Sequence, residues 1–381
     1  MLQAAREFRI GRPQIFAGLM LLSFLAQSIW AAGSRKLSDL EYQYIASGLS
    51  PDAARDRVVD SPFTAWVASL PVRATRAART IAPPALSSAL AIPRPWLLRL
   101  PFIGFGLWLG GALWWVARRL FDDAGGYVAL ALYCTSPAMI MISSNIGPDI
   151  VLAWSLFGLV YTAIGVAHTL YAPPRKWAPR AVILGLALGF ALSTALWSFL
   201  MAPLAFAFMI YLAPGRRRSA LAVLAGASVI ALAVLGFFAW SVGGSRPGSL
   251  SLVSPDPSLG LLRNLGFALN KDTDGYVLVA LFITAVTAYG SWPRTRYFGN
   301  TAPLLTAFVT VVLFALVPAT HLWDAALGLS FIFVFVGGVA ADLLETGLRR
   351  TLALILTAGF LLRIVLGLRT LWLYWIGQNR T

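Results

Sequence analysis

The sequence predicts an all-α polytopic membrane protein with about eleven transmembrane helices. Of its 381 residues, 59% are hydrophobic and only 12% are charged, far from the balance of a soluble globular domain. The mean hydropathy is +0.76. Apolar runs of roughly 20 residues, the length that crosses a hydrocarbon core, recur along the chain, and short basic clusters separate them. These observations indicate a single transmembrane domain over residues 1–381.

Each predicted span is an apolar run bounded by charged or Gly- and Pro-rich segments. The spans are expected at residues 13–32, 98–118, 126–143, 149–171, 180–196, 197–213, 219–241, 275–292, 300–319, 323–344 and 351–374. Residues 180–212 are too many for one span and few for two, so we interpret them as a hairpin that turns near Ser193 and Thr194. The first span is too long and too poorly matched to a cleavage site for a removed signal peptide, which predicts a permanent anchor.

The basic clusters predict the orientation, because short loops rich in Arg and Lys stay in the cytoplasm. With an odd number of spans, the N-terminus is expected inside and the C-terminus outside a bacterial-type inner membrane. The segments assigned to the inner side carry Arg6, Arg9, Arg12, Arg118, Arg119, Arg175, Lys176, Arg180, Arg216, Arg217, Arg218, Arg294, Arg296, Arg349 and Arg350. The formal charge of +15 is spread among these clusters rather than gathered on one patch, so no nucleic-acid partner is expected.

Two outer segments are long, at residues 33–97 and 242–274. In the first, Phe63, Trp66, Val67 and Leu70 fall on one stripe of a helix, which Pro62 begins and Asp60 or Ser61 caps. A run of arginines at steps of three follows. We expect a juxtamembrane helix that either lies beside anionic headgroups or caps the bundle. The second segment is rich in Gly, Ser and Pro and is expected to be mainly loop.

Carboxylates stand at the outer ends of two spans. Asp39 and Glu41 follow the first span, and Asp149 opens the fourth span after Pro148. The single cysteine, Cys134, lies in an apolar run, so neither a disulfide framework nor a Cys/His metal cluster is expected.

Several segments together resemble the GT-C class of integral-membrane glycosyltransferases, in the branch of protein O-mannosyltransferases and aminoarabinose transferases. They are "DLEYQYI" at 39–45, "DSPFTAWVASLP" at 60–71, "RLPFIGFGLWLGGALWWVARRLFDDAGGYVALALYCTSPAMIM" at 99–141, "GPDIVLAW" at 147–154, "LGLALGFALST" at 184–194 and "THLWDAALGLSFIFVFVGG" at 320–338. The resemblance implies an inverting transfer of a sugar from a polyprenyl-phosphate donor to an acceptor at the outer face of the membrane.

Such a transfer needs a carboxylate that takes the proton of the acceptor hydroxyl. In the family one acid of an adjacent pair is the presumed base, whereas here Leu40 separates Asp39 from Glu41. We favour Glu41 as the base, with Asp39 as its partner. The alternative is that Asp39 caps a short helix beginning near Leu40.

The resemblance also implies an acid at Asp149 that helps to bind a divalent metal. With Asp39 or Glu41 it would hold Mg²⁺ or Mn²⁺ through oxygen ligands and water. The alternative is that Asp149 is simply favoured by the dipole at a helix N-terminus.

The departing phosphate needs cationic partners, because its charge grows as the bond breaks. The family often has a basic residue at the outer end of the hairpin, where this chain has Ser193 and Thr194. Arg263, Lys271 and His321 are the expected replacements.

A second reading is a catalytically inactive GT-C-like subunit that serves the structure or assembly of a membrane protein complex. The split acid pair, the missing basic residue of the hairpin and Asp60 in place of the family's usual histidine favour it. The outer-face acids at family positions favour the enzyme. A transporter ranks last, since the sequence has no visible inverted repeat.

Overall fold

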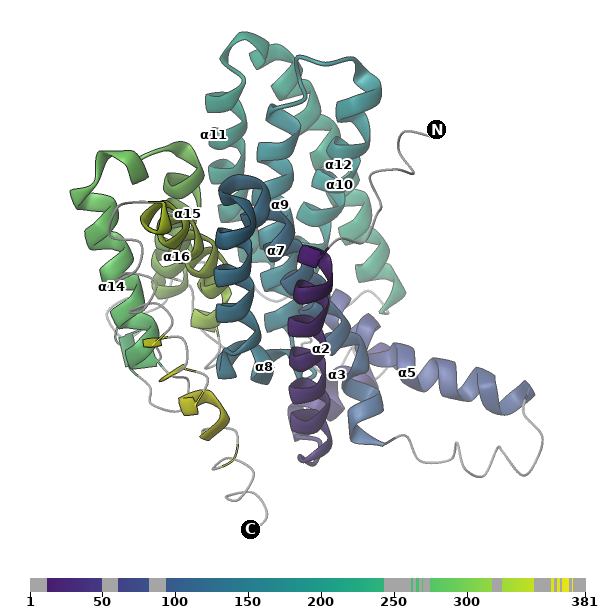
Figure 1. The fold of residues 1–381 in the computed structure, drawn as a ribbon. Coiled ribbons are helices and arrows are strands. Elements are labelled where there is room, and N and C mark those ends of the chain that lie inside the picture. The colour runs from purple at the N-terminus through teal and green to yellow at the C-terminus, as the bar shows by residue number, and fades with distance from the viewer. Residues whose placement is uncertain are drawn as a thin grey trace.

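The computed structural model describes residues 12–49, 61–81, 94–242, 275–316 and 324–345, together with single positions between 262 and 372. This part of the chain is helical (Figure 1). Six of its helices are long and apolar enough to cross a membrane, and shorter apolar helices accompany them. The predicted all-α membrane architecture is therefore confirmed, and the number of eleven spans stays a prediction. The last predicted span, 351–374, lies mostly outside the described residues.

The α-helices begin and end close to the predicted spans. They are α2 (Arg12–Gly33), α3 (Asp39–Leu49), α5 (Pro62–Ile81), α7 (Pro95–Cys134), α8 (Pro137–Ser143), α9 (Pro148–Ala167), α10 (Pro174–Thr194), α11 (Ala202–Leu212), α12 (Arg217–Ser241), α14 (Gly275–Ser291), α15 (Phe298–Leu316) and α16 (Leu329–Leu344). Short 3-10 turns join several of them: η1 (Leu196–Met201), η2 (Pro214–Arg216), η4 (Pro293–Thr295) and η5 (Asp324–Gly328).

Helix α7 is a hairpin of two arms rather than one straight rod. The backbone is non-helical at Phe121 and at Asp122, where φ is +62°. The hydroxyl of Tyr133 donates a hydrogen bond of 2.6 Å to the carbonyl of Gly106, 27 residues earlier. In a straight helix these residues would be about 40 Å apart. The chain therefore reverses at Phe121 and Asp122, as the separate predicted spans 98–118 and 126–143 require.

Two further predicted details have different outcomes. Helix α10 ends at Thr194, and η1 and α11 lead the chain back, so the predicted hairpin of 180–212 is confirmed. The predicted span 126–143 is wrong as one helix, because it breaks at Thr135 and Ser136. There Ser136 caps α8 by accepting a hydrogen bond from the N–H of Met139.

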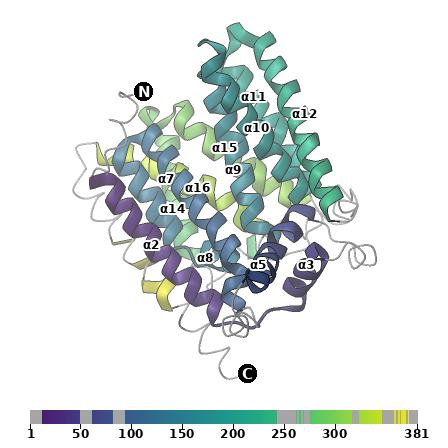
Figure 2. The same ribbon diagram turned by 90° about the vertical axis from the view of Figure 1, so that its right-hand side faces the viewer.

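The helices pack in layers around α7, α9 and α16 (Figure 2). Helix α9 is almost entirely buried, as expected for a span surrounded by other helices. Small residues let α7 and α16 approach closely: a Cβ atom at Gly337 would lie 2.7 Å from the carbonyl oxygen of Gly125. Close approach through small residues is a common way for membrane helices to associate.

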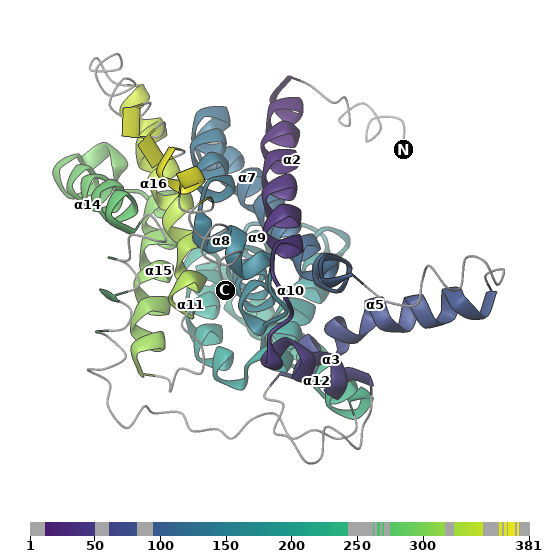
Figure 3. The ribbon, with the colours of Figure 1, turned by 90° about the horizontal axis from the view of Figure 1, so that it is seen from below.

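Helices α3 and α5 lie at one end of the bundle, and α5 extends sideways from it (Figure 3). Pro62 begins α5 as predicted, and the carbonyl of Ser61 accepts the first helical hydrogen bond, from Ala65. The predicted apolar stripe faces the bundle. The centre of the Phe63 ring lies 4.8 Å from the centre of the Phe190 ring and 4.7 Å from the centre of the Phe238 ring. This packing holds the start of α5 against the bundle.

We expect Gly48→Ala to lower the free energy of unfolding by about 1–3 kcal/mol through overpacking. A Cβ atom at this position would lie only 2.0 Å from the carbonyl oxygen of Ala65, so α3 and α5 would have to separate. Reversible unfolding in mixed micelles measures the change. The matched control is Gly18→Ala, where a Cβ would meet no atom within 4 Å. Equal stability of the two variants would contradict the prediction.

Candidate functional site

The start of α3 carries a reciprocal capping pair. The side-chain hydroxyl of Ser38 accepts a hydrogen bond of 3.3 Å from the N–H of Glu41, and a carboxylate oxygen of Glu41 accepts one of 2.8 Å from the N–H of Ser38. This is the capping box, in which Ser and Glu three residues apart satisfy each other's backbone donors. The alternative of Asp39 as the cap is therefore wrong: Ser38 caps the helix, and Asp39 is its first residue.

Glu41 also forms a buried ion pair with Arg99 at the beginning of α7. The guanidinium donates through Nε to Oε1 at 2.8 Å and through an Nη to Oε2 at 2.6 Å. Glu41 is 4% exposed and Arg99 1% exposed. A bidentate arrangement of this kind is among the strongest side-chain hydrogen bonds. It joins two helices whose sequence positions are far apart.

The remaining N–H groups of Arg99 bind the last turn of α2 and the short connection that follows it. They donate to the carbonyl oxygens of Ala32 at 2.6 Å, Arg35 at 2.9 Å and Lys36 at 2.9 Å. All five guanidinium donors are thus used. A cation at a helix C-terminus is favoured by the helix dipole and satisfies carbonyl groups that the helix leaves free.

The same network reaches the loop between α8 and α9. Oε1 of Glu41 accepts a hydrogen bond of 3.0 Å from the N–H of Ile146. Arg35 donates to the hydroxyl of Ser144 at 2.6 Å. Glu41 is therefore bound to the loop that leads into α9 and Asp149, so the structure brings the two predicted acidic segments to the same end of the bundle.

The environment of Glu41 keeps its carboxylate ionised. Burial is the largest single influence and would raise its pKa, but hydrogen bonds and charge from Arg99, with the N–H groups of Ile146 and Ser38, outweigh it. The net effect lowers the pKa of Glu41 below its usual value. With its oxygens occupied and its pKa lowered, Glu41 is a poor proton acceptor. The geometry favours a positioning role for Glu41, and the catalytic roles of both acids stay predictions.

Asp39 and Asp149 have contrasting surroundings. Asp39 is exposed at the start of α3. Asp149 is buried in the first turn of α9, where the helix dipole favours a negative charge. Among the described residues, no group of three or more His, Cys, Asp or Glu side chains could hold a metal ion. The predicted Mg²⁺ or Mn²⁺ site at Asp149 and Asp39, which would need water as well as carboxylate ligands, stays a prediction.

The predicted phosphate-binding residues Arg263, Lys271 and His321 lie outside the described residues, and their roles stay predictions. The arginines that complete the network, Arg99 and Arg35, are ones that sequence reasoning missed as site residues. A signal was present, since both stand at the predicted outer end of an apolar span, where the positive-inside rule does not place a cation. A buried arginine at such a position requires a partner.

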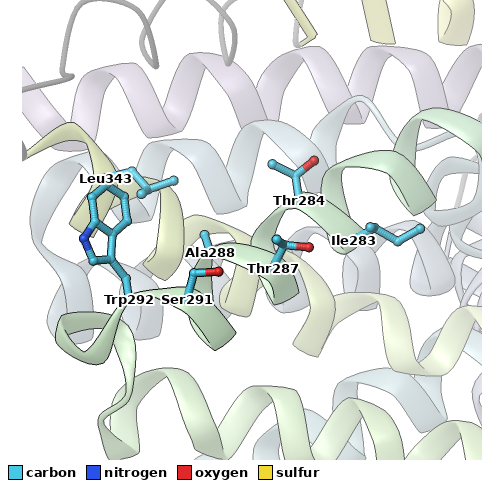
Figure 4. Close-up of a pocket in the computed structure, with 7 residues that line it drawn as sticks. All are labelled: Ile283, Thr284, Thr287, Ala288, Ser291, Trp292 and Leu343. Atoms are coloured by element: carbon cyan, nitrogen blue, oxygen red, sulfur yellow. The ribbon is translucent and has the colours of Figure 1, made fainter.

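A groove of about 530 Å³ lies on other elements, α14 and α16 (Figure 4). Its lining mixes the hydroxyl groups of Thr284, Thr287 and Ser291 with the apolar side chains of Ile283 and Leu343. Helix α3 and the start of α7, which hold the Glu41–Arg99 pair, take no part in it.

Comparison with known proteins identifies related chains. Residues 84–240 match the model of a family described as dolichyl-phosphate-mannose-protein mannosyltransferase. No curated protein matches the chain by sequence.

Solved structures share the fold. ArnT from Cupriavidus metallidurans in its apo state is 13% identical, with a TM-score of 0.63 over 95% of this chain and 74% of ArnT. The same protein bound to undecaprenyl phosphate is 14% identical, with a TM-score of 0.65 over 94% of this chain and 76% of ArnT. The oligosaccharyltransferase from Archaeoglobus fulgidus in its apo form is 14% identical, with a TM-score of 0.52 over 95% of this chain and 56% of the oligosaccharyltransferase. The resemblance predicted from the sequence is thereby confirmed: the chain has the fold of GT-C membrane glycosyltransferases, and its central segment matches the mannosyltransferase family.

Proposed function

We propose that the protein is an inverting glycosyltransferase that moves a sugar from a polyprenyl-phosphate donor to an acceptor hydroxyl at the outer face of the inner membrane. The observation that carries this proposal is the network of Glu41 and Arg99, which fixes the start of α3 and leaves Asp39 exposed beside it. The likeness in fold to ArnT, one structure of which holds undecaprenyl phosphate, supports a lipid-linked donor.

In the proposed reaction Asp39 takes the proton of the acceptor hydroxyl. The hydroxyl oxygen attacks the anomeric carbon from the side opposite the phosphate, the bond from that carbon to the phosphate oxygen breaks, and the lipid phosphate leaves. Glu41 contributes by holding α3 against α7 through Arg99. Arg263, Lys271 and His321 are the proposed partners of the leaving phosphate.

The depth of the site fits a lipid-borne donor. Helix α9 begins just after Ile146, which binds Glu41, and its 20 residues extend about 30 Å, the thickness of a hydrocarbon core. The site therefore lies near one membrane surface, where a headgroup would be while its tail stays in the bilayer. The basic segments after α9 and before α12 lie at the other end, which supports an outward-facing site by the positive-inside rule.

The test is a donor assay on the full chain in proteoliposomes. Undecaprenyl-phosphate-linked sugars are supplied one at a time with a membrane extract as the source of acceptor, and release of undecaprenyl phosphate is measured. The proposal expects release with at least one donor, dependent on acceptor. Tight binding of a partner membrane protein from the extract, without release of lipid phosphate from any donor, would instead support the inactive assembly subunit.

A further inference from the structure

Two loops at the end of the bundle opposite Glu41 form one surface. The hydroxyl of Tyr171, after α9, accepts a hydrogen bond of 3.3 Å from the N–H of Gly215 in η2. The guanidinium carbon of Arg216 lies 5.8 Å from the centre of the Tyr171 ring, within the range of a cation–π contact. The loop between α9 and α10 and the turn before α12 are thus joined through Tyr171.

This surface is strongly basic. We define the basic surface by the exposed residues Tyr171, Arg175, Lys176, Arg216, Arg217 and Arg218. The sequence contains no Asp or Glu between Asp149 and Asp256. Within the part of the chain that the structure describes, no residue of the basic surface takes part in an ion pair. The positive charge of the basic surface is therefore not offset by an ion pair or by a carboxylate close to it in the sequence.

The basic surface lies at the depth of lipid headgroups. It follows the far end of α9, about 30 Å from the loop that binds Glu41, and borders the apolar helices α10 and α12. Basic residues at a membrane surface attract anionic headgroups by about 1 kcal/mol each. The positive-inside rule alone would explain why these loops are basic. It would not explain the hydrogen bond and the ring contact that join the two loops.

We propose that the basic surface binds the phosphate headgroups of anionic phospholipids, at the membrane face opposite the Glu41–Arg99 pair. The arginines and Lys176 supply the positive charge. Because the ring of Tyr171 contacts Arg216, the charges of the two loops lie together and act on the same layer of headgroups. This binding is independent of sugar transfer and serves to anchor α9, α10 and α12 in a bilayer that contains acidic lipid.

The experiment measures lipid binding to the delipidated full chain by native mass spectrometry, with phosphatidylglycerol or phosphatidylcholine as the probe. We expect preferential binding of phosphatidylglycerol. The double variant Arg216→Gln/Arg217→Gln should bind phosphatidylglycerol about 30-fold more weakly at low salt, with a smaller loss as salt is raised. Tyr171→Ala, which changes no charge, should weaken binding about threefold.

The matched control is Arg294→Gln/Arg296→Gln, which also removes two exposed cations, from the connection between α14 and α15. Arg294 pairs with Glu345, and Arg296 donates to the carbonyl groups of Tyr289 and Gly290 at the end of α14, so phosphatidylglycerol binding should change less than threefold. Thermal unfolding of each variant verifies that it is folded. Equal binding of the two lipids, an equal loss in the control, or complete displacement of phosphatidylglycerol by millimolar inorganic phosphate would each overturn the proposal.

Discussion

Replacing Arg99 with methionine is expected to lower the free energy of unfolding by about 3–5 kcal/mol. The variant would leave the carboxylate of Glu41 buried without its charged partner, and would free the carbonyl groups of Ala32, Arg35 and Lys36 at the end of α2. Removing one member of a buried ion pair costs far more than the pair itself contributes, because the remaining charge stays desolvated. Reversible unfolding in mixed micelles measures the loss.

A second variant separates the buried charge from the other contacts. In Glu41→Gln/Arg99→Met both charges of the buried pair are removed together, while Gln can still cap α3 by the same geometry as Glu. We expect this double variant to be more stable than Arg99→Met alone, with a coupling energy measurable in a double-mutant cycle. If Arg99→Met unfolds like the wild type, the pair does not hold the site together.

The variant Asp39→Asn is expected to reduce transfer by a factor on the order of 10²–10⁴ while leaving stability nearly unchanged. The amide keeps the shape of the side chain but cannot take a proton, and Asp39 is exposed, so its replacement disturbs little packing. The measurement is the rate of release of lipid phosphate from the donor that proves active, at saturating acceptor.

Asp122→Asn is the matched control for Asp39. It makes the same chemical change at an exposed acid in the bend of the α7 hairpin, at the opposite end of the bundle. It should keep full transfer. Glu41→Gln is unsuitable as the decisive variant, because it leaves Arg99 buried without a carboxylate and so lowers stability as well as activity. Normal transfer by Asp39→Asn would exclude Asp39 as the base and direct attention to Asp149.

The span pattern was largely predictable from sequence because it depends on local composition. An apolar run of sufficient length defines a span, and the charged tip of the α7 hairpin separated two apolar runs, between which the backbone reverses at Phe121 and Asp122. The interruption at Ser136 was missed. Ser136 followed by Pro137 is a local signal for the start of a helix. The residues on both sides are so apolar that a hydropathy average over the segment does not detect the break.

The site was predictable only in part. The acids were found because a carboxylate beside a membrane span is conspicuous, whereas the Ser-x-x-Glu spacing at 38–41, which is typical of a capping box, was missed in favour of Asp39 as the cap. The partner of Glu41 was not, because Arg99 is 58 residues away and any of several arginines in the first outer segment could have paired with it. Long-range pairing depends on how helices pack, which no local pattern encodes. That pairing is the reason why we propose a positioning role for Glu41, although the sequence favoured it as the base.

The reach of Arg99 has a consequence for how the chain is made. The end of α2 and the start of α3 are completed by a side chain that the ribosome adds 58 residues after Glu41. Until α7 has entered the bilayer, the carbonyl groups of Ala32, Arg35 and Lys36 have water as their partner instead of the guanidinium. The connection between α2 and α3 therefore reaches its final structure only after α7 has been made, and insertion of the second membrane segment completes it.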